Sequence, residues 1–222
     1  MRQALKSVTK FSLILGLALA LPALSAYADS HSDDDAFRAA VKAVKARNYS
    51  HALDLFETQA KAAKHDAQYN MAVLLQAGKG RPRNYPDALY WSWLALLGGI
   101  EDAADIADDM QDALTEDDVK KVRSRVAESL QARLDNGDIQ AIPQFADYHL
   151  SILDEPDYST AYIWYSIAVA LNIPEMADRR DDAEDNIDDK DLARLQSEAN
   201  ALFDKYEFAP FNPSGKGGSN DS

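Results

Sequence analysis

The residue types that perform catalysis are scattered along this sequence and form no known catalytic pattern. The 222 residues include no cysteine, no G-x-S-x-G and no H-E-x-x-H. His51, His65 and His149 lie far apart and share no spacing typical of metal ligands. Gly78-Lys79-Gly80 lacks the remainder of a phosphate-binding loop, so we interpret both glycines as turn residues. The sequence therefore favours a protein without enzymatic activity, and it implies no cofactor.

A run of carboxylates at residues 178–191, DRRDDAEDNIDDKD, is a first candidate for cation binding. An EF-hand loop needs ligands at alternating positions, a glycine at its sixth position and a terminal Glu, and none of these is in register. We interpret the run as a solvated acidic face, in which Asp188 caps the start of a helix.

A sharper candidate is Asp29-Ser30-His31, which begins the mature protein if the chain is exported and cut after Ala28. A free α-amine, two deprotonated backbone amides and the imidazole of a third residue together form a square-planar set of four nitrogens. That geometry suits Cu(II) and Ni(II). Asp29, Ser30 and His31 are therefore a metal-binding alternative, and the site depends wholly on where the chain is cut.

Residues 1–28 have the pattern of a secretory signal peptide. Three basic residues precede an apolar run at residues 11–21, and Ala26-Tyr27-Ala28 is a small-x-small cleavage site. Removal of this segment changes the formal net charge from −14 to −17. Such acidity argues against binding nucleic acid or an anionic membrane by charge. We expect a periplasmic protein cut after Ala28 and not inserted in the membrane; secretion beyond the envelope is the alternative.

The elements that position the remaining candidates are paired helices. In the stretch from Ala67 to Ala103, apolar residues recur at helical spacing as far as Leu75, and a polar turn follows at residues 78–84. A second helical run ends at Gly98-Gly99. Neither helix of this hairpin of about 36 residues could hide its apolar face alone, so the pattern indicates a helical repeat.

The residues of this hairpin stand at the positions that define a known repeat. The matching residues are Ala67, Tyr69, Met71, Ala72, Leu75, Gly78, Gly80, Ala88, Trp91 and Ala95. The departures are Ala72 for a packing glycine, Arg81 for Val, Asn84 for Asp and Ser92 for a second aromatic. The chain thus resembles the Sel1-like repeat family, which is related to the tetratricopeptide repeats. The resemblance implies an all-α fold of αα-hairpins stacked into a short right-handed superhelix. It also implies a role in holding proteins, since envelope members of the family act as adaptors in polysaccharide export, motility and signal control.

The same pattern recurs later in the chain. Ala88, Trp91, Ala95, Leu114, Val119, Val122 and Leu130 are followed at 73 residues by Ala161, Trp164, Ala168, Ile187, Leu192, Leu195 and Phe203. Before the turn the spacing is 74, because Ala67, Met71 and Ala72 correspond to Ala141, Phe145 and Ala146. We therefore predict a repeat domain at 35–208, with hairpins at about 35–65 and 66–136 and a duplicate of the latter at 138–208. We expect residues 29–34 to be a flexible leader and residues 209–222 a disordered tail.

The aromatic residues carry the remaining information. Trp91 and Trp164 occupy one repeat position, so we expect both in the core. Tyr90 and Trp93 match no aromatic residue in the second copy. Either they pack beneath a neighbouring helix or the C-terminal tail, or they form an exposed patch that anchors a partner. Tyr90 and Trp93 are the partner-binding candidates.

Three functions are consistent with these patterns. The first is a non-enzymatic periplasmic scaffold that holds a protein or peptide partner of the bacterial envelope, in assembly, export or signalling control. The second is binding of Cu(II) or Ni(II) by the mature N-terminus. The third is an enzyme acting on cell-wall or polysaccharide substrates, which a carboxylate of raised pKa in a cleft would indicate.

Overall fold

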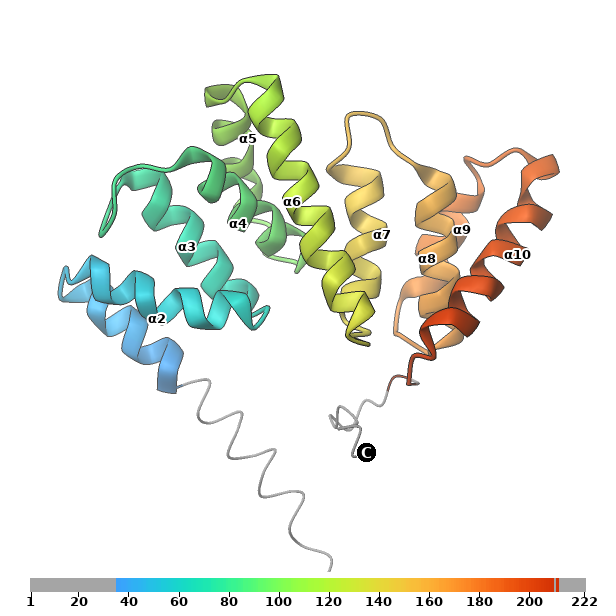
Figure 1. Ribbon diagram of the computed structural model, residues 1–222, viewed down its shortest axis with the longest axis horizontal. Coiled ribbons are helices and arrows are strands. Elements are labelled where there is room, and N and C mark those ends of the chain that lie inside the picture. Colours follow the sequence, from blue (N-terminus) through green and yellow to red (C-terminus); the bar gives the residue numbers. More distant parts are fainter. Residues whose placement is uncertain (1–34, 210, 212–222) are drawn as a thin grey trace, which may run out of the picture.

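The computed structural model describes residues 35–209 and residue 211, and every regular element within them is a helix (Figure 1). The predicted all-α class is therefore confirmed for these residues. A first helical segment covers residues 35–45. The helices that follow are α2 (Tyr49–Lys61), α3 (His65–Ala77), α4 (Tyr85–Leu97), α5 (Ala103–Ala113), α6 (Glu116–Asp135), α7 (Ala141–Ser151), α8 (Tyr158–Ala170), α9 (Met176–Glu184) and α10 (Asp189–Tyr206). The predicted signal peptide and leader, and nearly all of the predicted tail, lie outside the described residues.

Local side-chain chemistry sets where several helices begin. The Oδ1 atom of Asp188 accepts a hydrogen bond from the backbone N–H of Lys190, 3.2 Å away, and α10 begins at this point. This bond satisfies one of the free N–H groups of the first helical turn. The helix cap predicted at Asp188 is therefore confirmed. Asn84, Thr115 and Asp157 cap α4, α6 and α8 in the same way.

The turn between α3 and α4 depends on two glycines. Gly78 ends α3 with a φ of +67°, and Gly80 has a φ of +84°. A Cβ atom on Gly80 would lie 2.6 Å from the carbonyl group of Tyr49, the first residue of α2. Only a glycine fits so close to another backbone. This contact holds the turn against α2 and carries Arg81 over that helix.

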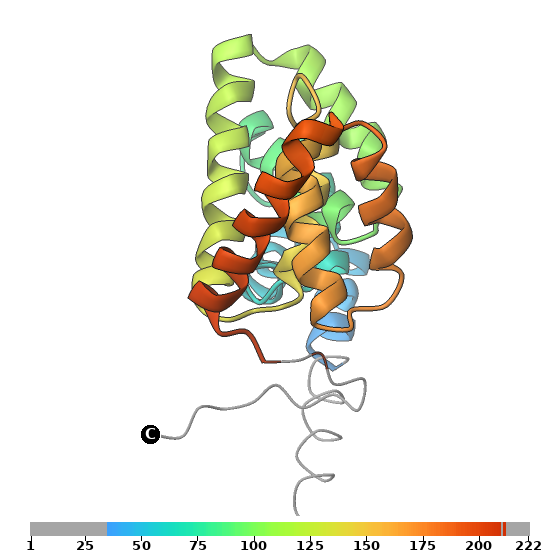
Figure 2. The same cartoon turned by 90° about the vertical axis from the view of Figure 1, so that its right-hand side faces the viewer.

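The helices pack in the same order twice. In the first unit α3 pairs with α4, and both α5 and α6 pack on α4. In the second unit α7 pairs with α8, and both α9 and α10 pack on α8. Figure 1 shows α6 near the middle of the molecule, with α2 towards one end and α10 at the other. Because α6 also packs on α7, it joins the two units. Figure 2 looks onto the end where α10 lies across α8.

Repeat-matched residues form the core of both units. Small side chains at these positions let the paired helices approach closely, and larger apolar residues fill the space beside them. The matched residues that are at most 1% exposed are Ala88, Ala95 and Val122 in the first unit and Ala161, Ala168 and Leu195 in the second. Within the described part of the chain, no helix is long and apolar enough to cross a membrane.

Candidate functional site

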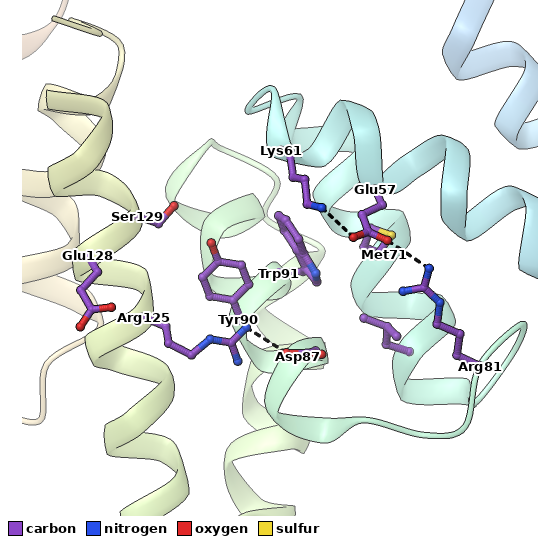
Figure 3. Close-up of a pocket in the computed structure, with 11 residues that line it drawn as sticks. Glu57, Lys61, Met71, Arg81, Asp87, Tyr90, Trp91, Arg125, Glu128 and Ser129 are labelled. Carbon is purple, nitrogen blue, oxygen red and sulfur yellow. Dashed lines mark hydrogen bonds and ion pairs between the residues drawn. The ribbon is translucent and has the colours of Figure 1, made fainter. Parts of the chain in front are cut away.

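A groove of about 540 Å³ opens where α2, α3, α4 and α6 meet (Figure 3). Sites that bind small ligands typically occupy ~300–1,000 Å³, so the groove has the size of a binding site. We call this surface the Trp91 groove. Its lining residues come from the four helices and from the turn before α4: Glu57, Lys61, Met71, Leu75, Arg81, Asp87, Tyr90, Trp91, Arg125, Glu128 and Ser129.

Trp91 is the largest aromatic surface in the groove. Its side chain is half-buried, and its ring meets the ring of Tyr90 edge-on with the centroids 4.8 Å apart. The expectation that Trp91 lies in the core is therefore wrong. Figure 3 shows the reason: α2 and α6 approach the ring from opposite sides without closing over it. Met71 of α3 lines the groove beside the ring but leaves part of it accessible.

Tyr90 and Trp93, the two partner-binding candidates, do not share this surface. Tyr90 is half-buried and lines the groove, whereas Trp93 is 2% exposed and belongs to the core. Around α4, Trp93 lies about 160° from Trp91, given about 100° per helical residue. Both α5 and α6 also pack on α4, and packing on several sides of this helix buries Trp93. An exposed patch containing Trp93 is ruled out, and the accessible pair is Tyr90 with Trp91.

A cluster of ion pairs borders the groove on the side of α2. The Glu57 carboxylate accepts hydrogen bonds from Lys61 Nζ at 2.8 Å and from Arg81 at 3.1 Å. Arg81 also reaches Asp54, at 3.1 Å. The hydrogen bond from Lys61 is the main reason that the pKa of Glu57 lies below its ordinary value. Glu57 thus stays ionised at neutral pH and is displaced in the opposite direction from a general acid, whose pKa would be raised.

On the opposite side, α6 supplies the polar groups. Arg125 donates to a carboxylate oxygen of Asp87, 2.9 Å away, and its guanidinium lies over the Tyr90 ring, 4.6 Å from the centroid. This stacking is a cation–π contact that holds the phenol ring in place. Glu128 and Ser129 follow on the same helix and face the groove (Figure 3). The groove therefore presents aromatic faces between bordering charges, which is the composition of surfaces that anchor polypeptides.

His149 is the one histidine with a displaced pKa, and it does not form a catalytic pair. Its side chain packs against Phe145 and Tyr148, with ring centroids 5.0 and 5.3 Å away. Its Nδ1 atom lies 3.6 Å from a carboxylate oxygen of Asp157, beyond hydrogen-bond distance. Burial lowers the pKa of His149 against the opposing influence of Asp157, so the ring is neutral at pH 7. Asp157 itself caps α8, which accounts for its position.

A buried polar cluster also joins α7, α8 and α9. The hydroxyl of Tyr165, a residue 1% exposed, donates to the carboxylate of Asp147. Arg179 donates to both oxygens of the same carboxylate, at 2.7 Å. Burial is the main cause that raises the pKa of Tyr165, so its hydroxyl keeps its proton. The groups satisfy one another, and we assign the cluster a structural role.

Metal ligation is decided elsewhere in the chain. Residues 35–209 and 211 contain no group of three or more His, Cys, Asp or Glu side chains that could hold a metal ion. Asp29, Ser30 and His31 lie outside the described residues. The copper and nickel site therefore stays a prediction.

Sequence reasoning missed the charged residues of the groove, although two signals were present. Glu57 and Lys61 are spaced by four residues on one helix, a spacing that favours an ion pair. Arg81 stands where the repeat pattern has an apolar Val. A charge at an apolar position of a repeat indicates a local partner, and here the partners are Asp54 and Glu57.

Comparison with known proteins gives no family for this chain. No protein-family model matches it, and no curated protein matches it significantly. The likeness to Sel1-like repeats thus rests on the residue pattern.

Proposed function

We propose that this protein is a non-enzymatic scaffold that holds a protein or peptide partner in the Trp91 groove. The observation that carries the proposal is a half-buried tryptophan that its repeat pattern would place in a core. An accessible Trp and Tyr pair at the centre of a groove, with charged residues around it, is the usual composition of an interaction hot spot. The groove carboxylate with a displaced pKa, Glu57, is shifted downward, which favours a binding role over acid–base chemistry.

The finer architecture and location belong to the same proposal. The Sel1-like pattern of residues 67–95 supports αα-hairpin repeats stacked into a short right-handed superhelix, with an extended surface for a partner. The signal-peptide pattern of residues 1–28 supports export to a bacterial periplasm, with secretion as the alternative. In that compartment the scaffold would act as an adaptor in envelope assembly, export or signalling control.

A crosslinking capture from envelope extract tests the proposal. The blocking variant is Ser129→Tyr, which adds a ring to the groove without removing a core side chain. Its matched control is Ser124→Tyr on the same helix, because Ser124 is exposed and does not line the groove. Helical circular dichroism first verifies that both variants fold. We expect one partner to be captured by wild type and Ser124→Tyr and lost by Ser129→Tyr. Equal capture by all three would move the site, and no specific capture would contradict the scaffold function.

The N-terminal metal site is a second candidate, supported by the sequence Asp29-Ser30-His31 after the predicted cut. Mass spectrometry of the exported protein gives its first residue. If that residue is Asp29, Cu(II) titration should saturate at one equivalent, and His31→Ala should abolish it. A different first residue, or equal binding by His31→Ala, would eliminate this site.

A further inference from the structure

The Trp91 groove has a counterpart in the second unit. A groove of about 410 Å³ lies between α6 and α7 and is lined by Ala127, Glu128, Gln131, Ala132, Asp135 and Phe145. Glu57, Lys61 and Met71 of the Trp91 groove reappear at 74 residues as Gln131, Asp135 and Phe145. The packing of α2 on α3 is likewise repeated by that of α6 on α7. The two grooves are therefore equivalent sites on the two units.

The second groove is partly occupied by the chain itself. Tyr206, at the end of α10, lies with its ring 5.7 Å from that of Trp164, the counterpart of Trp91. Its hydroxyl accepts a hydrogen bond from Gln131 Nε2 at 2.7 Å. Phe208 stacks on Tyr206 with centroids 5.0 Å apart. These aromatic residues cover Trp164, which is 4% exposed.

The first unit has no such cover. The residue that corresponds to Tyr206 is Arg133, and it points to other partners: its guanidinium donates to Asp138 at 2.7 Å and to Gln144 at 2.6 Å. The counterpart of Phe208 is Asp135, which bonds Gln131 at 2.8 Å. Trp91 consequently keeps an accessible face where Trp164 carries a tyrosine.

We propose that the Trp91 groove binds a partner polypeptide through a tyrosine side chain that takes the place Tyr206 takes in the second groove. The ring packs on Trp91 as Tyr206 packs on Trp164. The hydroxyl donates to Glu57, which stands at the position of Gln131. This inference rests on the proposed scaffold function and adds the chemistry of the partner.

Glu57 makes tyrosine a better occupant than phenylalanine. A carboxylate accepts hydrogen bonds and cannot donate, so it suits a phenolic O–H. Lys61 and Arg81 hold the carboxylate at the groove edge, at 2.8 and 3.1 Å. A phenylalanine at this place would bury the ring equally well but would leave that bond unmade.

The occupant is a partner and not a second copy of the chain. The chain's own aromatic segment is engaged on its own second unit, where Tyr206 and Phe208 are packed on Trp164 and on each other. The segment is tied further along by a hydrogen bond from the N–H of Phe211 to the carbonyl of Leu171, at 2.9 Å. Release of these contacts would uncover Trp164, so binding in trans would exchange one groove for another.

The test uses the purified full chain and a dye-labelled peptide of residues 202–211, LFDKYEFAPF, as a stand-in for the partner. Fluorescence anisotropy is measured with this peptide and with its Tyr206→Phe and Tyr206→Ala forms. We expect Tyr206→Phe to weaken binding about tenfold, the value of one hydrogen bond to a charged acceptor, and Tyr206→Ala to abolish it.

Protein variants locate the contact. Ser129→Tyr should abolish binding of the peptide, and Ser124→Tyr should leave it unchanged. Glu57→Ala should bind the natural and the Tyr206→Phe peptides equally, because the acceptor is gone. Glu57→Gln, which restores the side chain of the second groove, should recover the preference for tyrosine.

Several results would overturn the inference: no binding of the natural peptide, equal binding of the Tyr206→Ala peptide, or binding that Ser129→Tyr leaves intact. Sedimentation of the protein alone decides the occupant, since a concentration-dependent dimer lost in Ser129→Tyr would assign the groove to a second copy. The capture experiment separates this failure from that of the scaffold. A partner lost with Ser129→Tyr while the peptides fail would retain the scaffold and reject the tyrosine.

Discussion

At the scale of single residues, one tryptophan position has two environments. Trp164 is held by Phe145, edge-on at 5.3 Å, and by Tyr206 at 5.7 Å. Trp91 has Met71 in place of Phe145 and no tyrosine above it. The same residue type thus stabilises the core of one unit and forms the accessible surface of the other.

Alanine substitution should separate these two roles. Trp164→Ala removes a buried ring and leaves a cavity, so we expect a loss of about 3–5 kcal/mol in the free energy of unfolding. Trp91→Ala removes a half-buried ring and should cost about half as much. Urea unfolding followed by circular dichroism measures both. Equal losses would show that Trp91 is as well covered as Trp164.

His149 should make stability depend on pH between 7 and 5. Burial holds the pKa of the folded His149 below its ordinary value of 6.5, so the unfolded chain binds the proton more readily. Stability should therefore fall as the pH drops below 6.5 and until it passes the folded pKa. His149→Leu should remove this part of the pH dependence.

Urea midpoints measured at pH 7 and pH 5 test the sign. The stability due to Glu57, whose pKa is also lowered, is present above the unfolded value of 4.5 and is lost only below that pH, so it does not enter this window. The same loss from pH 7 to 5 in wild type and His149→Leu would contradict the assignment.

At the scale of helices, a polar chain connects the two units across α3, α6 and α7. Gln144, which is 6% exposed, accepts a hydrogen bond from Arg133 at 2.6 Å, and its amide nitrogen lies 3.1 Å from His65 Nε2. His65 Nδ1 lies 2.9 Å from Gln68, whose amide donates to the carbonyl of Ala60 at 3.1 Å. The junction is thus bonded from α2 to α7, and partial loss of such a network leaves buried polar groups unpaired.

Gln144→Ala should weaken this junction. We expect a loss of about 1–3 kcal/mol in the free energy of unfolding, because Arg133 and His65 each lose a partner. Asn70→Ala is the matched control: Asn70 is the repeat counterpart of Gln144, and its side chain donates to the carbonyl of Asp66 within its own helix. It should change stability by less than about 0.5 kcal/mol. Similar losses for the two variants in urea unfolding would show that the network contributes nothing.

The helices were predictable from the sequence because their signals are local. Apolar spacing and the cap at Asp188 depend on neighbours within a few residues, and both predictions hold. The faces of α4 were not predictable, because the burial of Trp93 depends on α5 and α6 folding back onto α4. His65 was expected at the end of a helix and instead begins α3, since Ala63 turns the chain with a φ of +56°.

At the scale of the whole molecule, the two units differ in what fills their grooves. The chain as a whole is acidic, with a formal net charge of −14. In the Trp91 groove, however, Lys61, Arg81 and Arg125 are each paired with a carboxylate. The attraction of a partner to this groove should therefore come from the aromatic surface more than from net charge. Because the end of the chain covers the equivalent surface of the second unit, a single groove of the pair is open.

Removal of the cover should open the second groove. Tyr206→Ala/Phe208→Ala takes away the rings packed over Trp164, so quenching of tryptophan fluorescence by acrylamide should increase. Because the exposed groove repeats the first, the stoichiometry of the 202–211 peptide should rise from one to two per chain in calorimetry. Lys205→Ala is the control, because its ammonium lies 4.8 Å from the centre of the Tyr206 ring and its loss leaves that ring in place. Helical circular dichroism of the double variant separates an opened groove from an unfolded α10. A folded double variant with unchanged quenching and one bound peptide would mean that Tyr206 and Phe208 do not act as a built-in occupant, and the equivalence of the two grooves would fail with it.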